Sequence, residues 1–364
     1  DAKVIADKMN EFFTSIGPEL ASNINTTNKK PFSAFLNKNT QNRPRLRFKC
    51  ITTKDTEKII SKMKPKSSCG TDGISMKIIK FCVQELASPI TSMINQSLIS
   101  GIFPEDLKCA KVIPIFKKDI VFVFDNYRPI SLLPSISKVF EKVVHIQLYE
   151  YFTDNKLLYP SQYGFLKGHS TETAILELVD QILQNMDKGK MPISIFLDLS
   201  KAFDTIDHNI MLDKLSYYGV RGQELSWFQS YLTNRSQQVL YNDVLSDKQC
   251  IKTGVPQGSI LGPLLFVIYI NDMPNASIFH SILYADDTTL ISPMCTFSPL
   301  NMSHVSVSEN VNRELKKVKD WMDVNKLSLN IKKTKFMVFQ WPQSRNTIRD
   351  HLDIRVDNVK IESD

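Results

Sequence analysis

The chain lacks any apolar run as long as the roughly 18 residues that a membrane-spanning helix requires. Its polar start, Asp1-Ala2-Lys3, does not resemble a secretory signal peptide. We therefore expect a protein with no membrane partner. Because the first residue is not Met, we also expect a fragment of a longer chain.

Cysteine is scarce, and its spacing argues against the usual cysteine-based sites. The chain of 364 residues has six cysteines, at positions 50, 69, 82, 109, 250 and 295. None forms a C-x-x-C pair, and no histidine lies at metal-ligand spacing, so we expect no zinc site. Scattered reduced thiols are typical of an intracellular chain. Internal repeats and long low-complexity tracts are also missing.

What is present is the composition of an ordinary globular protein of two or three domains or subdomains, 42% hydrophobic and 23% charged. The 45 Lys and Arg exceed the 38 Asp and Glu, for a net charge of +7. This modest excess favours a polyanionic partner, although many basic proteins bind no nucleic acid. Residues 26–50 form a candidate linker, and their basic residues fit a solvated tether and a nucleic-acid contact equally well.

The expected strands and helices occur in mixed order, which favours an α+β fold over a doubly wound parallel sheet. Residues 1–25 read as an amphipathic helix that Gly17-Pro18 breaks. Ser170 is expected to cap a second helix that packs behind strand 193–197. We expect the apolar stripe of this helix to be core: Ile175, Leu178, Val179, Ile182, Leu183 and Met186.

Three aspartates stand beside apolar strand sequence. Asp198 follows the run 193–197, and Asp286 and Asp287 lie inside an expected hairpin at 281–291. Carboxylates next to buried strands are costly unless a cation compensates them. Two divalent ions roughly 3.5–4 Å apart would do so, and polymerases, nucleases and phosphatases all share that arrangement.

The expected pairing supports this reading, but a structural alternative exists. If strand 193–197 lies beside the hairpin, opposed side chains are about 4.5–5.5 Å apart at Cβ, which suits carboxylates that share ions. Asp286-Asp287 at a hairpin tip is not a favoured turn pair. The alternative is an exposed Asp-Asp turn and a helix cap at Asp198. Spacing alone favours the two readings equally.

The neighbouring motifs resemble those of reverse transcriptases, most closely the non-LTR retrotransposons of the jockey-like group. The segments similar to motifs A, B and C occur in order as Phe196–Asp204, Gly254–Pro263 and Tyr284–Asp287. Further similar segments are Asn126–Leu133, Gln162–Phe165 with Ser170-Thr171, and the stretch with Trp321, Asn325–Leu327, Leu329-Asn330 and Lys333-Thr334. The resemblance spans about residues 65 to 340.

The resemblance implies a right-hand polymerase of fingers and palm, with an antiparallel palm sheet backed by helices and the thumb missing. The expected divisions are residues 1–50 as helix and linker, 51–190 as fingers, 191–345 as palm, and 346–364 as a truncated lead-in to the primer grip. An endonuclease domain is expected upstream in the full-length polyprotein. The implied location is the nucleus, the cytoplasm or both.

The implied reaction is RNA-directed DNA synthesis, the transfer of dNTPs onto a primer 3′-hydroxyl. The partners are an RNA template, a DNA primer and dNTPs, and the cofactor is a pair of Mg²⁺ ions, with Mn²⁺ as a substitute. Asp198, Asp286, Asp287 and the Leu199 carbonyl would be the metal ligands. Lys333 would be the general acid for pyrophosphate, although Lys332 and Lys335 are close in sequence.

Five further residues would bind the nucleotide if the resemblance holds. Phe203 would block a 2′-hydroxyl, Gln257 and Gly258 would line the nucleotide, and Lys118 and Arg128 would hold the triphosphate. Each has a structural alternative. Phe203 is one of 21 phenylalanines and could belong to the core. The Pro-Gln-Gly turn could simply start a helix, and the two cations could be ordinary surface residues.

Two departures from the family pattern concern the fingers. The stretch Ile120–Phe124 is apolar where the family has a polar loop with glycine, which bears on the placement of Lys118. Leu166 stands where an Arg is common, so a template contact is lost or shifts to Lys167. Besides the active enzyme, two alternatives remain: a nucleic-acid-binding remnant without productive synthesis, and an RNA-dependent RNA polymerase, against which Phe203 argues.

Overall fold

The computed structural model describes residues 1–27, 29–36, 43–292, 304–340 and 352–363. The chain folds into two compact units, each assembled from segments far apart in sequence. Unit 1 contains Asp1–Ser22, Asn39–Leu157 and Phe203–Ile268, and unit 2 contains Asn23–Lys38, Leu158–Ala202 and Tyr269–Asp364. The divisions expected from the sequence are consecutive ranges, whereas these units are discontinuous. The division into fingers and palm stays a prediction. The expected boundary at 345/346 lies outside the described residues.

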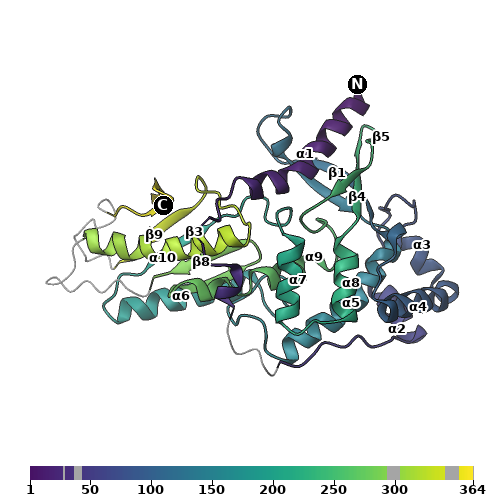
Figure 1. Ribbon diagram of the computed structural model, residues 1–364, viewed down its shortest axis with the longest axis horizontal. Coiled ribbons are helices and arrows are strands. Elements are labelled where there is room, and N and C mark those ends of the chain that lie inside the picture. The colour runs from purple at the N-terminus through teal and green to yellow at the C-terminus, as the bar shows by residue number, and fades with distance from the viewer. Residues whose placement is uncertain (28, 37–42, 293–303, 341–351, 364) are drawn as a thin grey trace. The chain divides into compact units, whose positions relative to one another are not determined.

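Unit 1 has a five-stranded sheet in the order β2-β1-β4-β5, with β6 also paired to β4 (Figure 1). Strand β1 is antiparallel to β2 and parallel to β4, and its Ala110 and Val112 are fully buried. The strands are β1 (Cys109–Phe116), β2 (Tyr127–Leu132), β4 (Arg235–Tyr241), β5 (Val244–Leu245) and β6 (Gln249–Ile251).

The helices of unit 1 pack around a core of large aromatic side chains. The ring of Phe103 is fully buried and lies 5.5 Å from that of Trp227 and 6.0 Å from that of Phe140. The helices are α1 (Ala2–Ser22), α2 (Thr53–Lys62), α3 (Met76–Phe81), α4 (Val83–Ser100), α5 (Ser135–Asp154), α7 (His208–Tyr217), α8 (Gln223–Leu232) and α9 (Gly262–Ile270), with short 3-10 turns η2 (Glu105–Leu107) and η3 (Phe124–Asn126).

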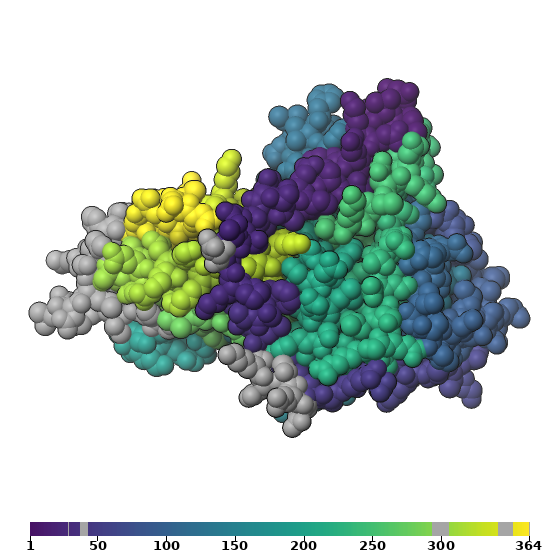
Figure 2. All heavy atoms as spheres, viewed as in Figure 1, coloured from purple at the N-terminus to yellow at the C-terminus, as the bar shows by residue number. Residues whose placement is uncertain are grey.

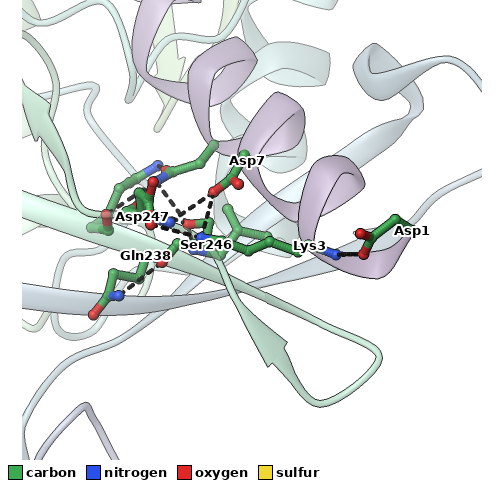
Figure 3. A network of polar contacts seen from close by, with 9 residues as sticks. Asp1, Lys3, Asp7, Gln238, Ser246 and Asp247 are labelled. Carbon is green, nitrogen blue, oxygen red and sulfur yellow. Dashed lines mark hydrogen bonds and ion pairs between the residues drawn. The ribbon is translucent and has the colours of Figure 1, made fainter.

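Helix α1 lies against the β4–β5 hairpin, and polar side chains bind the two together (Figures 2 and 3). Lys3 Nζ contacts Asp7 Oδ1 at 3.0 Å and Asp247 Oδ1 at 2.7 Å. Buried Asn10 donates to the carbonyl of Asp247 and accepts from the Gln237 amide at 3.0 Å. Helix α1 is therefore an integral part of unit 1.

The expected helix over residues 1–25 is present as α1, but the expected break at Gly17-Pro18 is wrong, because α1 continues through Pro18 to Ser22. Gly17 instead permits a close approach between backbones. A Cβ at position 17 would lie 2.3 Å from the carbonyl oxygen of Asp204. The glycine is explained by packing rather than by helix termination.

The basic segment that follows residue 42 makes protein contacts. The Arg43 guanidinium lies 4.1 Å from the centre of the Tyr217 ring, and Arg45 pairs with Glu224 at 3.5 Å. Leu46 is buried, and Tyr151 donates a hydrogen bond to the carbonyl of Pro44. For Arg43 and Arg45, these contacts favour a structural role over a nucleic-acid contact.

Unit 2 is built on a five-stranded sheet with β3 at its centre, in the order β12-β9-β3-β8-β7. Strand β3 is antiparallel to both neighbours, and β12 is parallel to β9. The strands are β3 (Ile193–Leu197), β7 (His280–Tyr284), β8 (Asp287–Ile291), β9 (Lys335–Val338) and β12 (Glu362–Ser363), with a separate pair β10 (Arg355–Val356) and β11 (Val359–Lys360).

Helices α6 (Thr171–Asp187) and α10 (His304–Val324) flank this sheet, with 3-10 turns η1 (Phe32–Phe35) and η4 (Met273–Ala276) nearby (Figure 1). Ser170 caps α6 as expected, through a reciprocal hydrogen-bond pair with Thr173. The expected core stripe of α6 is only partly right. Ile182 and Met186 are buried, whereas Ile175, Val179 and Leu183 are exposed. The helix buries Ala174 against Ile282 of β7 and Ile291 of β8. That it packs behind β3 stays a prediction.

Candidate active site

Asp198 and Asp287 stand at adjoining ends of two paired strands. Leu197 of β3 pairs with Thr288 of β8 in antiparallel register. The next positions outward are therefore 198 and 287, which continue opposite each other. The predicted pairing of the Asp198 strand with the hairpin is confirmed.

The hairpin turn differs by one residue from the expected position. Tyr284 pairs with Asp287, so the two turn residues are Ala285 and Asp286 rather than Asp286 and Asp287. Ala285 has a φ of 57°, a left-handed conformation that a side chain disfavours. Such backbone costs about 1–3 kcal/mol and is concentrated at functional sites. The turn thus presents Asp286 on a strained backbone.

The three carboxylates repel one another. Partial burial raises the pKa of Asp287, and the charges of Asp286 and Asp198 raise it further. One cation lies close by: Lys333 Nζ is 3.6 Å from Asp198 Oδ2. This pair is partly exposed, with 62% of the Lys333 and 35% of the Asp198 side chain accessible, so solvent screens it. The cluster is therefore suited to binding added positive charge.

The backbone of a short loop before β9 is hydrogen-bonded to the residues that follow β3. Asn330 donates its amide to the Asp198 carbonyl at 2.8 Å, and Ser200 donates to the Ser328 carbonyl at 2.8 Å. Leu199 forms an isolated antiparallel bridge with Leu329. This pairing carries Lys333 to Asp198, a contact that the sequence did not suggest.

The donor set fits a hard divalent cation. Carboxylate oxygens are the ligands that Mg²⁺ prefers, and Mg²⁺ is usually held by one or two carboxylates together with substrate phosphates and water. Within the ranges that the structure describes, no three His, Cys, Asp or Glu side chains are arranged to hold a metal ion without further ligands. A metal site whose remaining ligands are substrate oxygens is consistent with the carboxylate donors and with the lack of a complete set of protein ligands among the described residues.

The Asp286 turn is supported from behind by the segment Ser161–Gly164. Tyr163 donates its amide to the Leu283 carbonyl at 2.7 Å, and Leu283 donates to the Ser161 carbonyl at 2.9 Å. A Cβ on Gly164 would lie 2.1 Å from the Ala285 nitrogen, so only glycine fits. The segment that resembles a family motif thus has a structural role that we did not predict.

In unit 1, the turn before α9 is hydrogen-bonded to β2. Ser131 donates its amide to the Gln257 carbonyl at 2.8 Å. Gly258 has a φ of 127°, and a Cβ there would lie 2.6 Å from the Ser131 carbonyl oxygen. Buried Glu141 accepts from the amides of Ile260 and Leu261 at 2.6 and 3.2 Å. The turn before α9 is therefore held by Ser131 of β2 on one side and by Glu141 of α5 on the other.

The amide of Gln257 is held by a residue outside the predicted set. Its Nε2 lies 3.0 and 2.9 Å from the two carboxylate oxygens of Asp204. Phe203, next to Asp204, stacks on Phe266 with ring centres 4.7 Å apart and stays half-buried. The only signal for Asp204 is its place in the segment Phe196–Asp204, which could have suggested a role.

The two predicted triphosphate ligands lie in the β1–β2 hairpin. Arg128 is exposed on β2 opposite Ile115, and Lys118 is exposed in the connection between the strands. The apolar loop of this connection is ordered by its own contacts, although Phe122 is 92% exposed. Asn126 and Tyr127 side chains donate to the carbonyls of Ile120 and Val121, each at 2.9 Å.

Unit 1 also contains a cavity of about 780 Å³ with a basic lining. Burial lowers the pKa of Lys138 there, and the nearby charge of Lys66 adds to this effect. The cavity includes Gly258 in its wall, so it reaches the turn before α9. Its cationic residues are Lys58, Lys62, Lys64, Lys66, Lys138 and Lys142. Sequence reasoning missed this cavity, because its lysines come from separate segments.

The structure thus gathers the predicted residues into two sets. Unit 2 brings together Asp198, Asp286, Asp287 and Lys333, with Leu199 beside Asp198. Unit 1 joins the turn of Gln257 and Gly258 to the strand of Arg128, and places Phe203 beside Asp204. The cysteines that the structure describes are free thiols, and Cys295 lies outside the described residues. In the same ranges, no helix is long and apolar enough to cross a membrane.

The chain is similar to proteins encoded by mobile elements. Residues 115–360 match the family model described as reverse transcriptase (RNA-dependent DNA polymerase). The chain is 30% identical over 261 residues to the probable RNA-directed DNA polymerase from transposon BS of Drosophila melanogaster, covering 68% of this chain and 28% of the relative. It is 27% identical over 310 residues to the RNA-directed DNA polymerase from mobile element jockey of Drosophila funebris, covering 82% and 32%.

These matches cover most of this chain but only part of each relative. The chain therefore spans about a third of the length of these relatives. The family model covers more than half of the chain, including the carboxylate cluster and the turn before α9. This chain accordingly belongs to the reverse transcriptase family, alongside the polymerases of jockey-like non-LTR mobile elements.

Proposed function

We propose that this chain carries the polymerase site of an RNA-directed DNA polymerase, which adds dNTPs to a primer 3′-hydroxyl on an RNA template. The observation that supports this most directly is the meeting of Asp198 and Asp287 at adjoining strand ends, with the pKa of Asp287 raised by burial and by Asp286 and Asp198. Membership of the reverse transcriptase family favours DNA synthesis over the other reactions that two metal ions catalyse.

The metal ligands would be Asp198, Asp286, Asp287 and the Leu199 carbonyl, holding two Mg²⁺ or Mn²⁺ ions. When bound, these ions supply positive charge for the transferred phosphate and the leaving pyrophosphate. The Nζ of Lys333 lies 3.6 Å from Asp198 Oδ2, a position from which it can serve as the acid for the leaving group.

The nucleotide-side roles fall to unit 1. Asp204 orients the Gln257 amide, so the other polar edge of Gln257 can face a nucleotide. The ring of Phe203, fixed on Phe266, would exclude a 2′-hydroxyl. Arg128 and Lys118 are exposed and can reach phosphate oxygens. In the right-hand description, we keep residues 51–190 as the fingers and residues 191–345 as the palm.

The lysine-lined cavity of unit 1 supports a nucleic-acid partner. Six lysines against two carboxylates, Asp55 and Glu150, give the cavity a net positive potential that attracts a phosphate backbone. We infer that the RNA template contacts this wall. Contacts of this kind position a strand and carry little sequence information.

Primer extension tests the proposal. The assay uses an RNA template, a DNA primer, dNTPs and Mg²⁺, with the wild-type chain, Asp286→Asn and the control Asp106→Asn. Asp106 is exposed in unit 1, so its substitution removes one charge without touching the cluster. We expect extension by the wild type and by the control, and only background incorporation by Asp286→Asn.

Three outcomes would contradict the proposal. Equal incorporation by the wild type and Asp286→Asn would overturn the assignment of the metal ligands. RNA binding without extension by any variant would favour a nucleic-acid-binding remnant instead. Preference for ribonucleotides would point to an RNA polymerase, which the aromatic Phe203 disfavours.

A further inference from the structure

One carboxylate of α6 gathers three donors from two other segments of unit 2. Glu177 Oε1 accepts from Ser161 Oγ at 2.7 Å and lies 2.8 Å from His280 Nε2. The phenol of Tyr163 donates to Glu177 Oε2. Ser161 and Tyr163 belong to the segment Ser161–Gly164, and His280 begins β7. Glu177 thus joins that segment to β7.

The protonation states suit this role. Burial opposes ionisation of Glu177, but the hydrogen bonds from Tyr163, Ser161 and His280 outweigh it, and the pKa of Glu177 is lowered. Burial and the adjacent Glu177 raise the pKa of Tyr163 to about 12, so its hydroxyl remains a donor. A carboxylate can accept all three bonds, whereas a glutamine amide has only one acceptor oxygen.

The segment that Glu177 holds is in direct contact with the turn of Asp286. Its backbone forms a parallel bridge with β7 at Gln162 and Leu283. Gln162 is buried, and its Oε1 accepts from the Gly164 amide at 2.8 Å. The backbone of Gly164 packs directly against that of Ala285, whose φ is 57°. A displacement of the segment would therefore release the strained turn residue.

We propose that Glu177 is a positioning residue for the metal-binding carboxylates: it locks Ser161–Gly164 against β7, and Gly164 holds the Ala285 turn that presents Asp286. This inference rests on the proposed function in naming Asp286 as a metal ligand. The hydrogen-bond partners of Glu177 are Ser161, Tyr163 and His280, none of which belongs to the carboxylate cluster. Its effect passes through the backbone of Gly164 and Ala285.

The test compares Glu177→Gln with Asp180→Asn on the same helix. Asp180 is exposed, and its carboxylate contacts Gln184 rather than Ser161–Gly164. The first readout is amide hydrogen exchange of the metal-free chain at residues 283–287. The second is the Kd for Mn²⁺, measured by titration without nucleotide or primer. Neither readout requires catalysis.

We expect Glu177→Gln to speed exchange at Leu283, because Leu283 donates its amide to the Ser161 carbonyl. We also expect Mn²⁺ binding about tenfold weaker, since lost outer-sphere support typically costs about 10–100-fold. Asp180→Asn should change neither. Tyr163→Phe, which removes a single donor, should give a smaller change in the same direction, and it replaces Glu177→Gln if that variant fails to fold.

Unchanged exchange at residues 283–287 in a folded Glu177→Gln variant would overturn the inference. So would equal changes in Asp180→Asn, because the effect would then be one of helix charge. If the wild type itself bound no Mn²⁺, the proposed metal site would fail, while the exchange readout would still decide the role of Glu177. The two failures are therefore distinguishable.

Discussion

Lys333 Nζ lies 3.6 Å from Asp198 Oδ2, beyond the end of β3. The lysine reaches this position because the loop before β9 pairs with the residues after Asp198. The side chain therefore compensates one carboxylate of a cluster that is crowded with negative charge. It also keeps a proton donor next to the proposed metal ligands.

Lys333→Gln should slow nucleotide incorporation without weakening divalent binding. Loss of a general acid typically lowers the rate by about 100-fold or more. The Kd for Mn²⁺ should stay the same or fall, because a competing cation leaves Asp198. Single-turnover incorporation and Mn²⁺ titration check the two parts. The exposed neighbour Lys332, changed to Gln, is the control, and an equal loss there would contradict the assignment.

Asp204→Ala should raise the KM for dNTPs, because it frees the Gln257 amide. The expected rise is about tenfold, corresponding to about 1.5 kcal/mol for one charge-assisted hydrogen bond. A double-mutant cycle with Gln257→Ala separates this effect from general damage. If Asp204 acts through Gln257, the double variant should be no worse than Gln257→Ala alone. Additive losses would argue against that link.

Phe203→Val should relax the choice between deoxyribonucleotides and ribonucleotides. The ratio of the two kcat/KM values should fall by about tenfold or more, since removing a steric block admits the 2′-hydroxyl. Phe266→Leu, which removes the stacked partner but keeps Phe203, should have a smaller effect. An unchanged ratio in Phe203→Val would leave Phe203 as an ordinary core residue.

Lys58→Gln should reduce the salt dependence of RNA binding. Each lost phosphate contact lowers the slope of log K against log salt by about 0.7–0.9. Lys54→Gln is a matched control, because Lys54 is exposed on the same helix, one turn earlier, and does not line the cavity. Filter binding at several salt concentrations gives both slopes. Identical slopes for the two variants would place the RNA elsewhere.

The chain should lose stability in mild acid through His145. Burial lowers the pKa of His145 to about 4, with a contribution from Lys142. As pH falls below the unfolded value of about 6.5, the unfolded state takes up a proton that the folded state refuses, so the free energy of unfolding decreases. The expected loss from about pH 7.5 to about pH 5 is about 2 kcal/mol.

His145→Gln cannot titrate and should lack this part of the pH dependence. Urea denaturation at the two pH values measures the difference between wild type and variant. Carboxylates titrate alike in both proteins and cancel in the comparison. Parallel losses in the two proteins would show that His145 does not contribute.

The carboxylate cluster is largely predictable from the sequence. Asp198 follows a run of apolar residues, and Asp286-Asp287 lies between two more, so local pattern locates the strand and hairpin. The turn itself was misplaced by one residue, because short-range preference does not favour Ala285 with a positive φ. Support from Gly164, 121 positions away, makes that conformation possible.

Features assembled from distant segments were not predictable. The exposed face of α6 has the same apolar spacing as a buried one, so periodicity could not show which residues would meet the sheet. Gly17-Pro18 reads locally as a helix break, yet the close approach of the Asp204 backbone explains the glycine. The Asp204–Gln257 contact and the lysine cavity likewise depend on tertiary packing rather than on local pattern.

The union of α1 with the β4–β5 hairpin has a consequence for synthesis on the ribosome. Asn10 and Asp247, which are hydrogen-bonded, are 237 positions apart in the chain. Helix α1 must therefore wait, with its apolar face uncovered, until residues near 250 have left the exit tunnel. Such distant pairing slows folding and lengthens exposure to aggregation. Nascent chains of this protein should accordingly depend on chaperones until the hairpin arrives.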